Sequence, residues 1–172
     1  MQEIEIVVDY NGIVVFDPDA LTRYFGGIAE GFNIYKRLTS SEDGEKVIRQ
    51  GIAVPILGIN DSFYKVFTRM ESEPAIIAPH LIVVQNSIFP LQVTEKLVIA
   101  DLSVFLEWGE GDAWQYLDIA PGFYEVTVQG FREIKDGAVS GFGFEILFRD
   151  SSSLPEFTAS LDRNMQILEI PE

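Results

Sequence analysis

The stretch from Glu107 to Asp118 holds the residues of this chain whose types and spacing could do chemistry. Glu107, Glu110 and Asp112 fall on one predicted turn, and Asp118 follows shortly after it. Oxygen ligands on a flexible loop suit Ca²⁺, although this spacing matches no EF-hand loop. A solvated acidic turn is the simpler interpretation. We therefore take Glu107, Glu110, Asp112 and Asp118 as candidate residues for contact with a partner.

Two tryptophans flank these acids in the segment WGEGDAW. Trp108 shares the parity of the apolar residues before it, which predicts a place in the core. Trp114 fits a core position and an exposed position equally well. An exposed indole could stack on a sugar or anchor a protein partner, where tryptophan is enriched among the residues that dominate binding energy. Trp114 therefore joins the candidate partner-binding residues.

The chain offers little for catalysis, with one histidine and no cysteine. His80 could serve a Ser-His-Asp arrangement, but no G-x-S-x-G nucleophile elbow accompanies it. Thiolate sites and disulfides are excluded, and zinc sites want several His or Cys ligands. Gly26, Gly27 and Gly31 match neither a dinucleotide fingerprint nor a P-loop. Paired carboxylates could hydrolyse glycans, yet no pair stands out. We predict a non-enzymatic protein without cofactors.

Acidic residues dominate the charge, with a formal net value of −15. Such a charge opposes contact with nucleic acids and anionic membranes and favours a basic protein as partner. It is uneven, because residues 36–69 carry a small positive surplus, whereas residues 70–130 carry nine acids against one lysine. Solubility alone would also account for this composition.

Alternating apolar and polar residues predict short β-strands along most of the chain. The predicted strands cover residues 3–10, 13–16, 32–38, 46–59, 63–69, 81–85, 97–108, 113–119, 123–129, 142–148 and 165–170, and residues 87–93 are predicted to continue extended through Pro90. Asn11-Gly12 and Pro121-Gly122 are typical of hairpin turns, and a further turn is expected at residues 134–137. Pro55 cannot donate to a strand ladder, so its strand is predicted at a sheet edge or at a bulge.

One short helix is predicted near residues 18–26. Asp17 can cap it, Pro18 suits its first position, and Gly26-Gly27 ends it. The whole pattern predicts a mainly all-β fold, an antiparallel two-layer β-sandwich or open barrel, as a single domain over residues 1–172. The sequence leaves the oligomeric state open, with pairing of two Pro55 edge strands as one option.

The location predicted for the protein is the cytoplasm. The segment MQEIEIVVDY carries acids where a signal peptide would carry basic residues, and no apolar run approaches the length of a membrane span. We therefore expect no contact with a membrane.

Residues 91–128, from LQVTEKLVIADLS to LDIAPGFYEVTV, resemble the competence-associated inhibitors of the DNA-entry nuclease and their uncharacterised bacterial relatives. The shared pattern is a Val-Thr run, then strands, then an apolar residue before Pro/x-Gly-x-Tyr and an alternating strand. The resemblance covers about a fifth of the chain. It implies a small cytoplasmic bacterial protein that binds and blocks a nuclease.

The sequence thus supports two functions. The first is a non-enzymatic bacterial binding protein, an acidic inhibitor of a basic partner such as a nuclease. The alternative is a β-sandwich module that binds a carbohydrate or small molecule through Trp114 and its neighbours, either with or without Ca²⁺.

Overall fold

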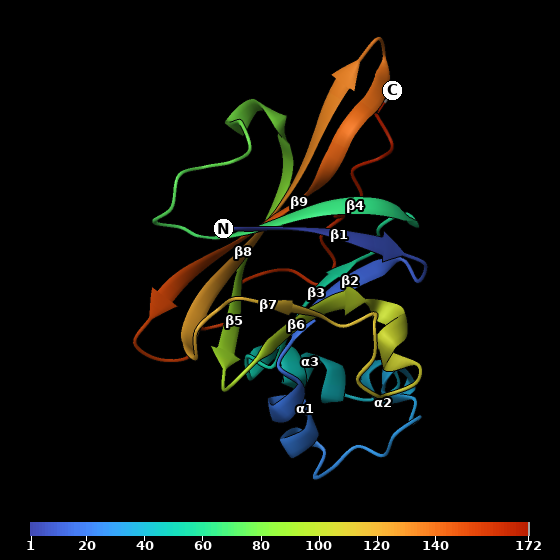
Figure 1. Cartoon of the computed structure of the whole chain (residues 1–172), viewed down its shortest axis with the longest axis vertical. Coiled ribbons are helices and arrows are strands. Elements are labelled where there is room, and N and C mark those ends of the chain that lie inside the picture. Colours follow the sequence, from blue (N-terminus) through green and yellow to red (C-terminus); the bar gives the residue numbers. More distant parts are fainter. Residues whose placement is uncertain (172) are drawn as a thin grey trace.

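The computed structural model describes residues 1–171 and shows two open β-sheets with a layer of short helices on one of them (Figure 1). The larger sheet, sheet A, has the strand order β1-β4-β9-β8-β5. Its strands are β1 (Gln2–Val8), β4 (Ser62–Met70), β9 (Ala138–Ser151), β8 (Gly122–Lys135) and β5 (Ile82–Val93). β4 and β9 run parallel and the other neighbours antiparallel. The prediction of a purely antiparallel fold is therefore wrong for this pair.

The smaller sheet, sheet B, is antiparallel throughout and has the strand order β3-β2-β6-β7. Its strands are β3 (Ala53–Leu57), β2 (Gly12–Phe16), β6 (Leu97–Asp101) and β7 (Gln115–Leu117). Pro55 lies in β3, at the edge of the sheet, as its missing N–H predicts.

Sheet B is buried on both faces, and this creates two cores. On one face Val15 and Ile99 pack toward sheet A, in the core that also contains Val126. On the other face Phe16 and Val98 pack against the helices. The runs GIVVF and LVIAD are continuously apolar for this reason, because neither face of β2 or β6 meets water. The predicted two-layer architecture is therefore incomplete, because the helices form a third layer on sheet B.

The predicted helix is confirmed as α1 (Pro18–Tyr24). Asp17 caps it, and its Oδ1 accepts a hydrogen bond from the Ala20 N–H at 2.9 Å. Its Oδ2 accepts from the backbone N–H and the hydroxyl of Thr94, both at 2.7 Å. Asp17 is fully buried, so this one carboxylate joins the helix start to the chain between β5 and β6.

Two further helices replace predicted strands, α2 (Ile34–Thr39) and α3 (Asp43–Arg49). Ile34 and Leu38 fit an alternating strand, but their spacing of four residues fits one face of a helix equally well. The structure takes the helical option, in which Ile34 is buried and Leu38 packs beside it. A run this short cannot distinguish the two periods.

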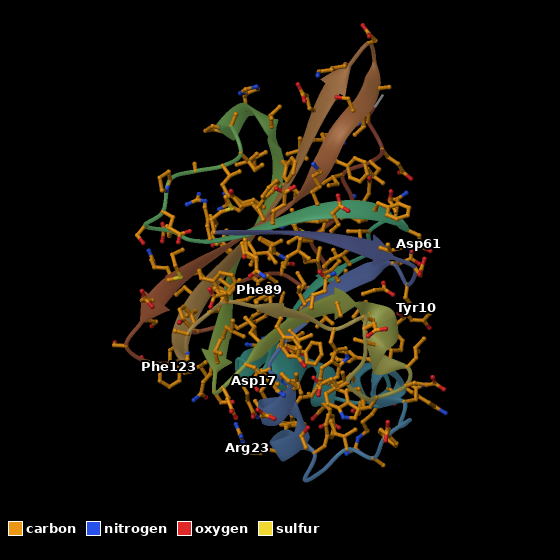
Figure 2. All side chains as sticks on the ribbon, viewed as in Figure 1. Tyr10, Asp17, Arg23, Asp61, Phe89 and Phe123 are labelled. Carbon is orange, nitrogen blue, oxygen red and sulfur yellow. The ribbon has the colours of Figure 1, made fainter. Side chains whose placement is uncertain are left out.

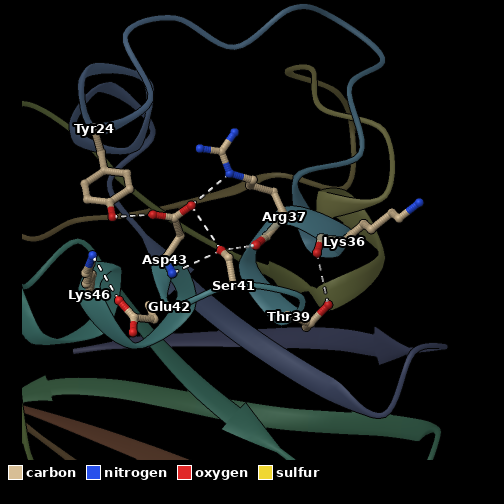
Figure 3. A network of polar contacts seen from close by, with 8 residues as sticks. All are labelled: Tyr24, Lys36, Arg37, Thr39, Ser41, Glu42, Asp43 and Lys46. Atoms are coloured by element: carbon tan, nitrogen blue, oxygen red, sulfur yellow. Dashed lines mark hydrogen bonds and ion pairs between the residues drawn. The ribbon is translucent and has the colours of Figure 1, made fainter.

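A polar network ties the three helices together (Figure 3). The Tyr24 hydroxyl donates to Asp43 Oδ1 at 2.7 Å, and Arg37 Nε donates to Asp43 Oδ2 at 2.8 Å. The Tyr24 bond, and after it the Arg37 bond, hold the pKa of the Asp43 carboxyl below its ordinary value. Ion pairs Glu42–Lys46 and Glu45–Arg49 add local support to the start and end of α3.

Two of the predicted hairpins are wrong, because the strands on either side of each turn do not pair with one another. Asn11 has the positive φ of a tight turn, 52°, but β1 pairs with β4 while β2 pairs with β3 and β6. The turn therefore carries the chain from sheet A to sheet B, and Pro121-Gly122 carries it back from β7 to β8. The turn at residues 134–137 does close a hairpin, β8 with β9, with positive φ at Asp136 and Gly137.

The strand predicted at residues 97–108 ends at Asp101 and is followed by the 3₁₀-helix η2 (Leu102–Phe105). Another 3₁₀-helix, η1 (Pro79–Leu81), precedes β5. The strand predicted at residues 165–170 is not formed. Met165 and Ile167 are buried in the core between the sheets without joining a ladder. Just before them, Ser160 bonds the Asn86 amide at 2.8 and 2.9 Å and so covers the edge of β5.

Within residues 1–171, no helix combines the length and the hydropathy that crossing a bilayer requires.

Candidate partner-binding surface

Asp118 follows β7, whereas the other three predicted acids, Glu107, Glu110 and Asp112, lie on an exposed loop between η2 and β7. Its backbone is anchored at Trp108, whose carbonyl accepts from the Gly31 N–H at 2.7 Å and whose N–H donates to the Phe32 carbonyl at 2.9 Å. The loop therefore packs against residues 26–33, which follow α1. The Glu30 side chain lies beside Gly109 and adds another carboxylate to the neighbourhood.

The four predicted acids are all exposed: Glu107, Glu110, Asp112 and Asp118. Within residues 1–171 no basic group lies within ion-pair distance of any of them. In contrast, Arg37, Lys46 and Arg49 of the region with a positive surplus all pair with acids of α3 or of the turn that leads into it. The negative charge of the loop is thus open to a partner, while much of the positive charge is neutralised internally.

Tyr116 organises one end of this surface. Its ring is 42% exposed, its hydroxyl donates to Glu110 Oε1, and the Lys96 ammonium lies 5.8 Å from the ring centroid. The hydrogen bond to Glu110, followed by burial and the charges of Glu110 and Asp19, raises the pKa of Tyr116 to about 12. The phenol is therefore neutral and holds the carboxylate of Glu110 in place throughout the neutral pH range.

Asp118 follows β7 at the place where the two sheets adjoin. Its N–H donates to Gln2 Oε1 at 3.1 Å, while Gln2 Nε2 donates to the Tyr116 carbonyl at 3.1 Å. Gln115 Nε2 reaches the Glu5 carbonyl at 2.9 Å. Glutamine side chains thus join the edge strand β7 to the edge strand β1, and the acidic surface continues across this seam to β1.

Trp114 does not lie on this surface. It is 8% exposed and meets Phe16 edge-on at 5.4 Å and Trp108 at 5.2 Å. The indole belongs to the core between sheet B and the helices, so it offers no ring face for a sugar or a protein anchor. Trp108 occupies the same core, as its parity predicts. Trp114 is buried because it fills the core between sheet B and the helices. The sequence did not predict a helical layer, so it did not predict this core.

The calcium alternative also loses its geometric basis. Within the described part of the chain, no three side chains of the His, Cys, Asp or Glu type converge closely enough to hold a metal ion. Glu107, Glu110 and Asp112 are near in sequence, but Glu110 is engaged by Tyr116.

An apolar groove is the main feature that the sequence did not predict. It lies between α2, α3, η2 and the edge strand β3 and has a volume of about 220 Å³. Its walls include Leu38, Val47, Pro55, Leu102 and Phe105. The groove depends on α2 and α3, which were predicted as strands, so sequence reasoning could not place it.

No protein-family model and no curated protein sequence matches the chain. Among solved structures, ComJ from Bacillus subtilis, an inhibitor of the DNA degrading activity of NucA, aligns over 88% of this chain and 96% of its own, with a TM-score of 0.53 and 13% identity. The fold resembles that of ComJ. The protein of crocagin biosynthetic gene J aligns over 86% of this chain and 95% of its own, with a TM-score of 0.50 and 15% identity.

The resemblance to ComJ confirms, as a likeness of fold, the relation that residues 91–128 suggested, and it extends over most of the chain. At these identities the likeness concerns the fold alone.

Proposed function

We propose that this chain is a non-enzymatic bacterial inhibitor that acts in the cytoplasm and binds a basic protein, such as a nuclease, through the surface of Glu107, Glu110, Asp112 and Asp118. The observation that carries the proposal is this set of exposed carboxylates, free of internal ion pairs within residues 1–171, on a fold shared with an inhibitor of NucA.

Electrostatics supplies the physical argument. The carboxylates sit on loops and at a sheet seam, where they remain hydrated until a partner arrives, so their main effect is on the rate of encounter. Oppositely charged surfaces can associate about tenfold to a thousandfold faster than neutral ones, and salt removes this advantage. A net charge of −15 repels DNA, so the proposed inhibitor would contact the nuclease and not its substrate.

The test measures degradation of plasmid DNA by purified NucA with increasing amounts of this protein, and association rates at stepped salt concentrations. We expect inhibition that weakens as salt rises. The variant Glu110→Lys/Asp112→Lys should associate with NucA at least about tenfold more slowly at low salt and show a flatter salt dependence.

The matched control is Glu156→Lys/Asp162→Lys, which reverses two exposed charges in the segment before Met165. This segment contains Ser160, which covers the edge of β5. It makes the same change in net charge, so equal losses in both variants would show a diffuse charge effect and contradict a local surface. If NucA neither binds nor is inhibited, nuclease inhibition of this type is wrong, and the apolar groove beside β3 becomes the place to test for small molecules.

A further inference from the structure

The outer face of sheet A, which points away from sheet B, exposes an apolar pair near one end of β1 and β4. Phe63 is 72% exposed and Val7 is 47% exposed, and the two are direct partners in the β1–β4 register. Side chains opposite each other on one face of such a pair lie in contact range. They therefore form one apolar patch on the surface and are not two isolated residues.

The neighbouring strand leaves Phe63 uncovered. Lys65 with Gly143 is the first pair of the parallel β4–β9 register, so the β4–β9 ladder does not extend to Phe63. At that first pair, Phe131 closes over Gly143, within 3.0 Å of where a Cβ would stand, and Phe67 packs on Phe131 at 5.9 Å. The sheet thus covers its other aromatic residues and leaves Phe63 in water.

Acidic side chains surround this patch. Glu3 and Glu5 precede Val7 on the same exposed face of β1, and Asp9 and Asp61 mark the end where β1 and β4 stop pairing. Figure 2 shows Asp61 and Tyr10 at this same end of the molecule. Lys65 is the nearby cation on β4, and it pairs with Glu3 at 3.6 Å. An exposed apolar centre within a charged rim is the usual anatomy of a protein–protein interface.

We propose that Val7 and Phe63 form the apolar centre of the surface that binds the basic partner. This inference rests on the proposed function and deepens it, because the glutamine contacts join β1, which carries Val7, to β7, which directly follows the acidic loop. The rim selects the chemistry of the occupant: a protein surface that presents an apolar or aromatic side chain flanked by Lys or Arg. Phe63 supplies the contact area and the carboxylates supply steering and register.

The first test compares Phe63→Ser with Val83→Ser in calorimetric titrations with NucA. Val83 is 45% exposed on β5, at the opposite edge of sheet A, so its change removes exposed apolar area elsewhere on the same sheet. We expect Phe63→Ser to weaken binding at least about tenfold with an unchanged salt dependence, and Val83→Ser to change it less than about twofold. If NucA binds and Phe63→Ser leaves the affinity unchanged, the inference is wrong while the proposed function stands.

A second test does not depend on NucA. The full chain is presented to a displayed library of twelve-residue peptides, and the selected peptides are then measured against Phe63→Ser. Peptides that combine Lys or Arg with an aromatic residue and lose affinity for Phe63→Ser would support the surface. The proposed surface would be overturned if no peptides are enriched, or if the selected peptides bind wild type and Phe63→Ser equally well. This outcome counts whether or not NucA has already been excluded as the partner.

Discussion

Tyr116 shows how one hydrogen bond links the acidic surface to pH. Its pKa is raised to about 12, chiefly because its hydroxyl donates to Glu110. An unfolded chain would release this proton near pH 10. Below pH 10 both states keep the proton, so the stabilisation is complete there. Between about pH 10 and 12 only the folded state keeps it, and the contribution to stability is lost as pH rises.

Tyr116→Phe should therefore flatten the alkaline fall in the free energy of unfolding between about pH 10 and 12 relative to wild type. The difference between the two proteins is the informative quantity, because burial also raises the pKa of Tyr64 to about 12. Ultraviolet titration of tyrosinate absorbance and denaturant unfolding measure it. Glu110→Gln should move one tyrosine toward its ordinary pKa, and an unchanged titration in that variant would contradict the assigned cause.

At the scale of elements, the parallel pair β4 and β9 carries a buried ion pair on the outer face of sheet A. Arg69 is 8% exposed and Glu145 is 1% exposed, with Arg69 Nε 3.3 Å from Glu145 Oε2. Arg69 Nη1 also donates to the Glu73 carbonyl at 2.9 Å. The pair therefore anchors the loop between β4 and η1 to the sheet, and sequence alternation alone could not have identified either residue as buried.

Arg69→Met should lower the free energy of unfolding by about 3–5 kcal/mol, because it leaves the Glu145 carboxylate buried without its partner. The double variant Arg69→Met/Glu145→Leu should recover most of this loss, since two apolar side chains need no compensation. Arg149→Met, which breaks exposed ion pairs with Glu71 and Glu125, should cost less than about 1 kcal/mol. Urea unfolding of these three variants and wild type decides this, and a double variant no more stable than Arg69→Met would refute the coupling.

At the scale of the whole molecule, sheet B contributes one face to each of the two cores. Both tryptophans lie on its helical side, whereas Val126 lies in the core between the sheets and is fully buried. Damage to one core should therefore weaken the other, because the strands of sheet B cannot keep one packed face after losing the other. A single cooperative domain is the expected behaviour of such an arrangement.

Val126→Ala should lower the free energy of unfolding by about 2–3 kcal/mol, and tryptophan fluorescence should report the same midpoint as far-ultraviolet circular dichroism. The fluorescence comes from the core that the substitution does not touch. Val83→Ser, at an exposed site, serves as the control and should leave both midpoints near those of wild type. Separate midpoints for the two probes would show two independent units and contradict one domain.

Local patterns in the sequence determined the features that depend on one residue and its near neighbours. Alternation predicted β1, β4, β8 and β9, Asp17-Pro18 predicted the start of α1, and Pro55 predicted an edge strand. The exposure of Glu107, Glu110, Asp112 and Asp118 also followed, because charged side chains in a turn remain in water.

Only the tertiary structure decided which elements meet. Asn11-Gly12 specifies a reversal of the chain, but the sheet that each strand joins depends on partners far along the sequence, as in the pairing of β1 with β4. Ile34 and Leu38 satisfy the strand period and the helix period alike, so the apolar face of sheet B, which needed a cover, settled the choice. That same cover buries Trp114. A sequence pattern records that a side chain needs burial, whereas the distant surface that provides it exists only in the folded chain.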